Sequence, residues 1–234
     1  MNKELIHKIL LICLIIASSS YIYTVFPEVN EYELGADEGT YYRQGKTILT
    51  HGFSGFNILA ETYIQNFERC EPNPLRNGHT ITTAFLLKIQ DSIFMLTLKS
   101  WIYFILLLFC SHWFIKRIWS TSSVFYIVLL LSISPLIAGM AKRAIIDIES
   151  LFYITLALYQ FLYYLNKPSN KKIYLFIALL SLSCFFKETA FFLIPFYFYI
   201  LLFLKIKNKN ISLIKIFLCC SVPVLAVGIV NLIL

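Results

Sequence analysis

Long apolar segments dominate the chain and restrict what it can fold into. They lie at about residues 5–26, 93–115, 119–140, 144–165, 172–186, 189–204 and 213–233. A helix of about 20 apolar residues crosses roughly 30 Å of hydrocarbon. The composition agrees, because 59% of the residues are hydrophobic and only 14% are charged, outside the usual range of soluble domains. We therefore predict an all-α, polytopic membrane protein with about seven transmembrane helices.

Two parts of this pattern need comment. Lys3 lies just before the segment 5–26, and Lys8 lies near its start. A basic start followed by an apolar stretch is also typical of a cleaved signal peptide, which is the alternative to an uncleaved span. The apolar character continues to Phe26, which favours the uncleaved span. The segments on either side of Lys187 and Glu188 are short for full crossings. We expect a helix that stops near the membrane interface there, followed by a polar turn and a return.

Residues 27–92 form the only long polar region, and prolines and glycines break it into pieces. The stretch from Thr82 to Ile89 reads as a short amphipathic helix at the membrane interface. A second helix is expected around Thr40 to Ile48. We interpret residues 1–234 as a single transmembrane module in which 27–92 is the first outer loop.

The basic residues at the ends of the spans predict the orientation. With a cytoplasmic N-terminus, eleven of the twenty basic residues share one face with a single acid, Glu4, and the other twelve acids lie on the opposite face. The eleven are Lys3, Lys8, Lys116, Arg117, Lys167, Lys171, Lys172, Lys205, Lys207, Lys209 and Lys215. We predict a multi-pass protein of the cell (inner) membrane, with the long loop and the C-terminus outside. The basic residues at the ends of the spans account for the net charge of +7, so this charge does not indicate a nucleic-acid partner, and none is expected.

Cysteine usage adds little chemistry. Five of the six cysteines lie in apolar segments, and Cys70 stands alone in the polar region. This arrangement offers neither a disulfide framework nor the spacing of a metal site.

Ionisable residues gather on the predicted outer face in three places. These are Asp37-Glu38, then Lys142-Arg143 with Asp147 and Glu149, and finally Lys187-Glu188. Ionisable groups near the membrane cost several kcal/mol unless they are paired or face a wet cavity, so they are functional candidates. Arg143 and Asp147 are four residues apart, which predicts a shared helix face and leaves a structural ion pair as the competing interpretation. Lys187-Glu188 has the same alternative, a pair at a tight turn.

Four stretches in order resemble the GT-C membrane glycosyltransferases, particularly the protein mannosyltransferase and aminoarabinose transferase branch. They are GADEGTYYRQGKTI, RNGHTITTAFLLKI, SPLIAGMAKRAIIDIESLFYITLALY and LSLSCFFKETAFFLIP. The resemblance covers about residues 5–205. Two features depart from the family: Thr80-Ile81-Thr82 stands where prolines usually follow the His, and family members are commonly much longer. The C-terminal part of the family is expected to be absent, so a partner chain could supply the missing spans.

The resemblance implies inverting transfer of a sugar from a polyprenyl-phosphate donor to an acceptor glycan, lipid or protein at the outer face. A carboxylate can take the acceptor's proton, and cations can stabilise the departing phosphate. On that basis Asp37 is the candidate general base, and Glu38 is a helper or metal ligand. As structural alternatives, Asp37 caps the helix that follows and Glu38 stabilises its N-terminus. A divalent cation at these two carboxylates is left open.

The remaining candidates would bind substrate. Arg143 and Lys187 are the phosphate ligands expected from the resemblance, and His79 is a third; a solvated histidine is the simpler reading of His79. Asp147 and Glu188 accompany these cations, and Tyr41 could stack on sugar or lipid, although interfacial tyrosines are common without such a role.

Two other functions fit parts of the pattern. A transporter or flippase of lipid-linked sugars would also place charges around a cavity, but such proteins usually carry midplane ionisable sites and internal repeats. A non-catalytic membrane subunit is the third interpretation.

Overall fold

The computed structural model describes residues 9, 11–18, 20, 37–66, 73, 76–118, 121–143, 146–207 and 211–233. Every regular element in these ranges is helical, which confirms the all-α class for the described chain. After the helical residues 11–18, the elements are α2 (Asp37–His51), η2 (Gly52–Ser54), α3 (Gly55–Gln65), α4 (Asn77–Ile89), α5 (Ile93–Ile118), α6 (Thr121–Ile133), α7 (Pro135–Lys142), α8 (Asp147–Asn166), α9 (Asn170–Phe186), η4 (Glu188–Phe192), α10 (Leu193–Ile206) and α11 (Leu213–Ile233). The predictions for Cys70, Lys209 and most of 1–36 fall outside the described residues.

Four described helices are long and apolar enough to cross a membrane. They cover Ile93–Arg117, Asp147–Asn166, Glu188–Ile206 and Leu213–Ile233. The bent pair α6–α7 makes a fifth if it counts as one span. The sequence predicted about seven. Part of the difference lies in α9, which at 17 residues falls just short of a full crossing, and part in segment 5–26, of which only some residues are described.

The bend between α6 and α7 corrects the expectation of a continuous span at 119–140. The two helices meet at 59°, and Pro135 is the first residue of α7. Proline has no amide hydrogen and clashes with the preceding turn, so a helix readily breaks there and starts anew. The break turns α7 toward the end of the bundle where the chain enters α8.

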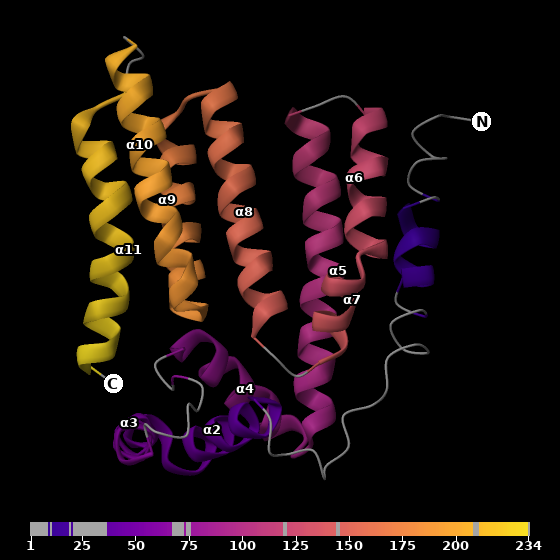
Figure 1. Cartoon of the computed structure of the whole chain (residues 1–234), viewed down its shortest axis with the longest axis vertical. Helices are drawn as coiled ribbons and strands as arrows, with labels where there is room; N and C mark the ends of the chain where they lie inside the picture. The colour runs from indigo at the N-terminus through magenta and orange to yellow at the C-terminus, as the bar shows by residue number, and fades with distance from the viewer. Residues whose placement is uncertain are drawn as a thin grey trace.

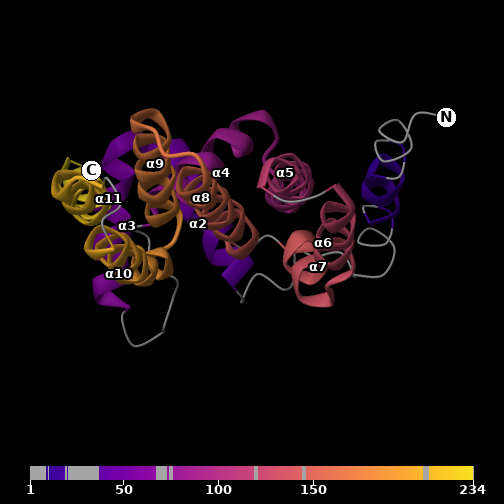
Figure 2. The ribbon, with the colours of Figure 1, turned by 90° about the horizontal axis from the view of Figure 1, so that it is seen from above.

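The long helices stand side by side, and α2, α3 and α4 lie across one end of them (Figures 1 and 2). We call these three helices the crosswise layer. The sequence predicted helices within 40–48 and 82–89; both are present and longer, as α2 and α4, while α3 was not expected. The long polar region is therefore an ordered helical layer over its described part.

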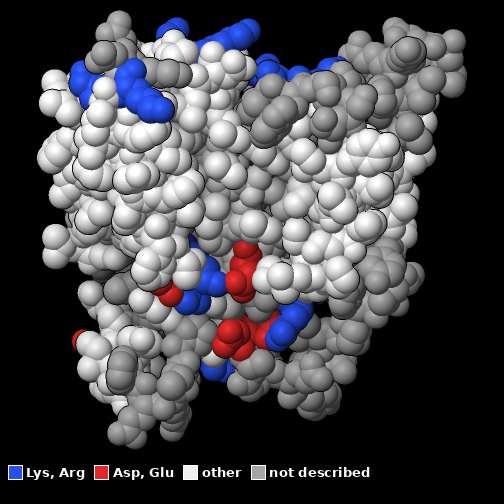
Figure 3. Space-filling view, turned by 45° about the horizontal axis from the view of Figure 1, so that its top comes forward, with Lys and Arg blue, Asp and Glu red and all other residues white. Residues whose placement is uncertain are grey.

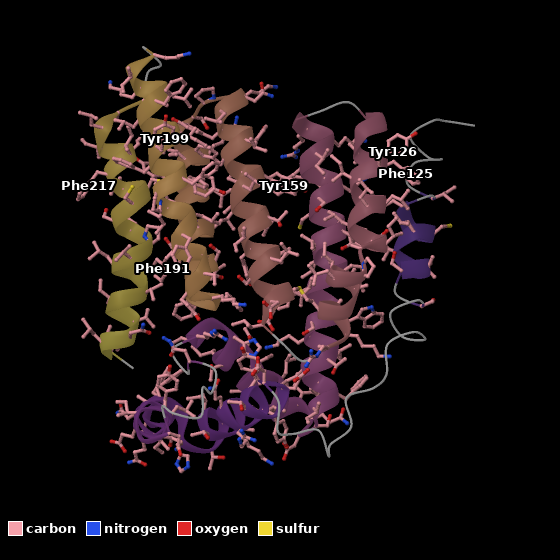
Figure 4. The ribbon with its side chains drawn as sticks, in the orientation of Figure 1. Phe125, Tyr126, Tyr159, Phe191, Tyr199 and Phe217 are labelled. Carbon is pink, nitrogen blue, oxygen red and sulfur yellow. The ribbon has the colours of Figure 1, made fainter. Side chains whose placement is uncertain are left out.

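The apolar core forms two large clusters. One is built from α8, η4 and the helices α9, α10 and α11, and includes Phe161, Phe176 and Tyr197. The other joins residues 11–18 to α5, α6, α7 and α8. Helix α8 contributes to both clusters and so connects the two halves of the bundle. Large aromatic residues such as Tyr126, Tyr199 and Phe217 are instead exposed on the outside (Figure 4), as expected for side chains that would face lipid.

Charges separate along the long axis of the bundle. The end opposite the crosswise layer, which we call the basic end, carries Lys116, Arg117, Lys167, Lys171, Lys172, Lys205, Lys207 and Lys215. Acidic and basic side chains instead gather together below the apolar band, near the crosswise layer (Figure 3). All acidic residues in the described ranges lie at that end, which agrees with the predicted grouping of span ends on two faces.

Two glycines allow the crosswise layer to pack closely. A Cβ on Gly78 would lie 2.9 Å from ring carbons of Phe185 and Phe186 at the end of α9. A Cβ on Gly45 of α2 would overlap the Thr83 side chain of α4. Glycine therefore lets α4 approach both the bundle and α2, and this packing positions the site described next.

Candidate active site

Three ion pairs lie where the crosswise layer meets the bundle: two join the layer to the bundle, and the third joins the ends of α8 and α9. Arg143 Nε lies 2.5 Å from Glu38 Oε1, and Lys187 Nζ lies 2.5 Å from Asp147 Oδ1. The Arg76 guanidinium donates two hydrogen bonds, of 2.6 and 2.9 Å, to the Glu188 carboxylate. Each pair connects residues that are far apart in the sequence; the Arg143 and Arg76 pairs hold the layer against the bundle, and the Lys187 pair holds α8 to α9.

These pairings correct two expectations. Arg143 and Asp147 do not share a continuous helix, because α7 ends at Lys142 and α8 begins at Asp147. Lys187 and Glu188 are likewise not each other's partners; Lys187 turns to α8 and Glu188 to Arg76. The spacing argument failed because the chain changes direction between the residues, so tertiary contacts decide the partners.

Tyr41 connects two parts of the site. Its hydroxyl oxygen accepts a hydrogen bond of 2.5 Å from Arg76, and its ring meets the His79 ring edge-on at 4.5 Å between centroids. Burial raises the pKa of Tyr41, and the nearby charges of Asp37 and Asp147 raise it further against the opposing effect of Arg76. Tyr41 therefore remains a neutral phenol, held in place, and its described contacts are protein side chains.

Asp37 is an exposed carboxylate of the site and lies in the first turn of α2. The neighbouring Glu38 is buried and bound to Arg143. The pKa of Arg143 is raised, chiefly by its hydrogen bond to Glu38 and also by the charges of Asp37 and Asp147. Asp37 thus lies close to a cation while remaining accessible, and of the two adjacent carboxylates it is the one free to meet a substrate.

A buried charged cluster lies behind these pairs. Glu149 Oε1 accepts contacts from His79 Nδ1 at 3.0 Å and from Lys99 Nζ at 2.9 Å, and Lys99 also donates to Thr83 Oγ1 at 2.7 Å. The side chains of His79, Glu149 and Lys99 are 1%, 0% and 4% exposed. Burial lowers the pKa of His79 and keeps its ring neutral near pH 7. We call His79, Glu149 and Lys99 the buried cluster.

The buried cluster retains two polar atoms without a partner among the described residues, His79 Nε2 and Glu149 Oε2. Unsatisfied buried polar atoms are costly and need a reason. The expectation that His79 is simply solvated is wrong, because the ring is enclosed by protein.

A groove of about 490 Å³ lies between α4, α5 and α8 and reaches Lys99 of the buried cluster. Apolar side chains of α4, α5 and α8 line it, among them Phe85, Leu106 and Phe152, and Phe85 is largely exposed at its edge. Its polar lining includes Lys99 and the Tyr103 and Tyr153 hydroxyls, which lie 3.1 Å apart. The groove therefore offers an apolar surface along most of its length and an ammonium group at one place.

The possibility of a divalent cation at Asp37 and Glu38 finds no support in the donor set. Glu38 already binds Arg143, whose charge would repel a metal ion. No group of three or more His, Cys, Asp or Glu side chains that could hold a metal occurs in the ranges that the structure describes.

The structure brings all eight predicted site residues to the junction of the crosswise layer and the bundle. Sequence reasoning missed Arg76 and Lys99 and did not give Glu149 a site role. Lys99 carried a signal, since it is the one charge inside the apolar segment 93–115. Arg76 sits in a polar region where an arginine is unremarkable, so only the fold identifies its partners.

Comparison of the chain with protein-family models, with curated proteins and with solved structures found no match.

Proposed function

We propose that this protein is a membrane glycosyltransferase of the GT-C type, which transfers a sugar from a polyprenyl-phosphate donor to an acceptor at the outer membrane face. The observation that carries the proposal is an apolar groove that reaches Lys99, at the same end of the helical bundle as the ion pairs of Arg143, Lys187 and Arg76. A donor of this class has the same two parts, a long hydrocarbon chain and an anionic phosphate. The ordered sequence resemblance points the same way.

Each half of the site suits one part of such a donor. Apolar groove walls suit an isoprenoid chain, which would gain by leaving contact with headgroups and water. Arg143 and Lys187, with Arg76 beside them, suit the phosphate because guanidinium and ammonium groups stabilise developing negative charge on oxygen. Arg143 is half-exposed and Lys187 partly exposed, so a substrate phosphate could compete for them.

The proposed step follows from these positions. The acceptor hydroxyl or amine attacks the anomeric carbon as the bond from that carbon to the phosphate oxygen breaks. The acceptor's proton passes to the Asp37 carboxylate, and the polyprenyl phosphate leaves with the electron pair and rests against the cations. Glu38, buried and bound to Arg143, positions that arginine. Tyr41 and Glu188 hold Arg76, and Asp147 holds Lys187.

The membrane orientation belongs to the same proposal. The basic end would face the cytoplasm and the crosswise layer the outer side, in line with the excess of Lys and Arg at cytoplasmic span ends. The substrate-binding ion pairs would then lie at the outer interface, where a lipid-linked sugar presents its headgroup.

Release of polyprenyl phosphate tests the proposal directly. The purified protein would be reconstituted in vesicles with a panel of 32P-labelled polyprenyl-phosphate sugars and a membrane extract as the source of acceptors. We expect release of labelled polyprenyl phosphate by the wild type and a loss of at least about a hundredfold in Asp37→Asn, since a positioned general base typically contributes that much.

Asp91→Asn is the matched control, because Asp91 is an exposed carboxylate of the same end that binds Lys46. It should release polyprenyl phosphate at the wild-type rate. Wild-type activity in Asp37→Asn would remove Asp37 from the mechanism, and no release from any donor in the panel would contradict the proposed function.

A transporter remains the second candidate because the buried cluster places Lys99 and Glu149 inside helices long enough to span a membrane. Buried ionisable residues of this kind often mark transport paths. Labelled donor that crosses sealed vesicles without forming a transfer product would favour transport over transfer.

A further inference from the structure

A second groove lies toward the basic end of the bundle, between the N-terminal helical residues 11–18 and α5. Its volume is about 550 Å³. Leu11, Ile12, Phe109 and Cys110 line its apolar part, and His112, Trp113 and Lys116 line the part nearest the end of α5. Its volume falls within the range of ligand pockets, roughly 300–1,000 Å³. The groove thus has apolar walls along its length and polar groups at one end.

Trp113, which lines the polar part of this groove, carries a cation over its ring. The Arg117 guanidinium lies over the Trp113 ring at 3.5 Å from its centroid, next to Lys116. The Arg117 guanidinium also faces the Tyr163 ring of α8 at 6.0 Å. The described residues at this end of the bundle include Lys116, Arg117, Lys167, Lys171 and Lys172, and the acidic residues among the described ranges lie near the crosswise layer.

We propose that this groove binds an anionic phospholipid, with one acyl chain along the apolar walls and the phosphate against Lys116 and Arg117. Basic pockets between transmembrane helices are suited to acidic headgroups, and tryptophan commonly sits at the level of the headgroups. A soluble anion would leave the apolar walls uncovered, and a zwitterionic lipid would gain less from the two cations. This site is separate from the groove at Lys99, and it does not depend on the proposed transferase activity.

Trp113 lines the groove and can report its occupant. With Trp101→Phe and Trp119→Phe, Trp113 is the remaining tryptophan. The full chain would be placed in phosphatidylcholine vesicles that contain a minor share of phosphatidylglycerol. Bromine on the acyl chains of one lipid or the other quenches the indole that it touches. At equal mole fraction of brominated lipid, we expect stronger quenching by brominated phosphatidylglycerol than by brominated phosphatidylcholine.

Charge variants then locate the headgroup. Lys116→Gln combined with Arg117→Gln should reduce the preference for phosphatidylglycerol by about thirtyfold, from the usual contribution of a basic residue near an anionic surface. Lys116→Arg with Arg117→Lys keeps both charges and should keep the preference, which separates charge from folding. Lys205→Gln with Lys207→Gln removes two charges from the same end on α10 and should change little.

Equal quenching by the two brominated lipids would overturn the proposal. So would an equal loss of preference in the α10 variant, because that result indicates diffuse attraction to the whole basic end. Displacement of brominated phosphatidylglycerol by soluble glycerol phosphate would show that the groove takes a free anion, and this too would overturn it.

Discussion

The buried cluster and the Lys46–Asp91 pair use similar charges in opposite surroundings. Lys46 Nζ lies 2.5 Å from Asp91 Oδ2, with both side chains nearly half exposed, whereas His79, Glu149 and Lys99 are enclosed almost completely. In water the attraction between charges is screened and their hydration remains; inside the protein hydration is lost and each charge depends on its partner. The Lys46–Asp91 contact is the shorter one, but it should contribute less to the stability of the fold than the contacts of the buried cluster.

Removal of Glu149 should have the largest effect on stability. Glu149→Ala leaves the buried Lys99 ammonium without its carboxylate partner. Removal of one member of a buried ion pair typically lowers the free energy of unfolding by about 3–5 kcal/mol. Thermal unfolding in detergent, followed by circular dichroism, measures the loss. Glu61→Ala, on the exposed face of α3, is the matched control and should unfold like the wild type.

A double variant tests whether this loss reflects the stranded charge. Lys99→Met with Glu149→Leu removes both members, and such replacements are often neutral or stabilising. We expect most of the stability lost in Glu149→Ala to return. If the double variant is as unstable as the single one, the charges are not the cause.

The packing that encloses the cluster should rank second. In Gly78→Ala, the new Cβ would press on Phe185 and Phe186 next to His79, and overpacking of this kind costs about 1–3 kcal/mol. Gly228→Ala is the control, because its Cβ would meet no atom within 4 Å. Equal unfolding temperatures for the two variants would contradict the close approach of α4 to α9.

Acidification should give the third effect, through His79. Burial lowers the pKa of His79 in the folded protein, whereas the unfolded chain binds a proton near pH 6.5. Below that pH the unfolded state therefore carries more protons, and the free energy of unfolding falls as pH falls, by at most about 1.4 kcal/mol per pH unit from this group.

Unfolding curves between pH 7 and pH 5, a range chosen around the ordinary histidine pKa of about 6.5, would reveal this slope. His79→Gln should reduce it and His51→Gln, at an exposed position, should leave it unchanged. A slope that persists in His79→Gln would assign the acid sensitivity to other groups.

Lys46→Ala should have the smallest effect. Its partner Asp91 stays hydrated without it, so the unfolding temperature should match that of the wild type within error. A clear loss of stability would mean that exposure does not separate the two kinds of ion pair in this protein.

The sequence predicted the helical class and the gathering of charged residues at one end, because these follow from composition and periodicity along the chain. The candidate residues that it named lie near one another, but their partners differ from the predicted ones. Arg143 and Asp147 show why. Helical spacing predicts a shared face only within one helix, and here one helix ends and the next begins between the two residues. Lys99 was visible as a charge among apolar residues, but its contact with Glu149 depends on how α5 and α8 pack.

The groove at Lys99 is open, and several of its apolar lining residues on α4 and α5, such as Phe85 and Leu106, are exposed. A ligand that arrives through the lipid meets this opening by diffusion in two dimensions. Its effective concentration is then its mole fraction in the bilayer, whatever the volume of the sample. Added plain lipid should slow turnover of a lipid-borne ligand at constant bulk concentration, whereas added buffer should not.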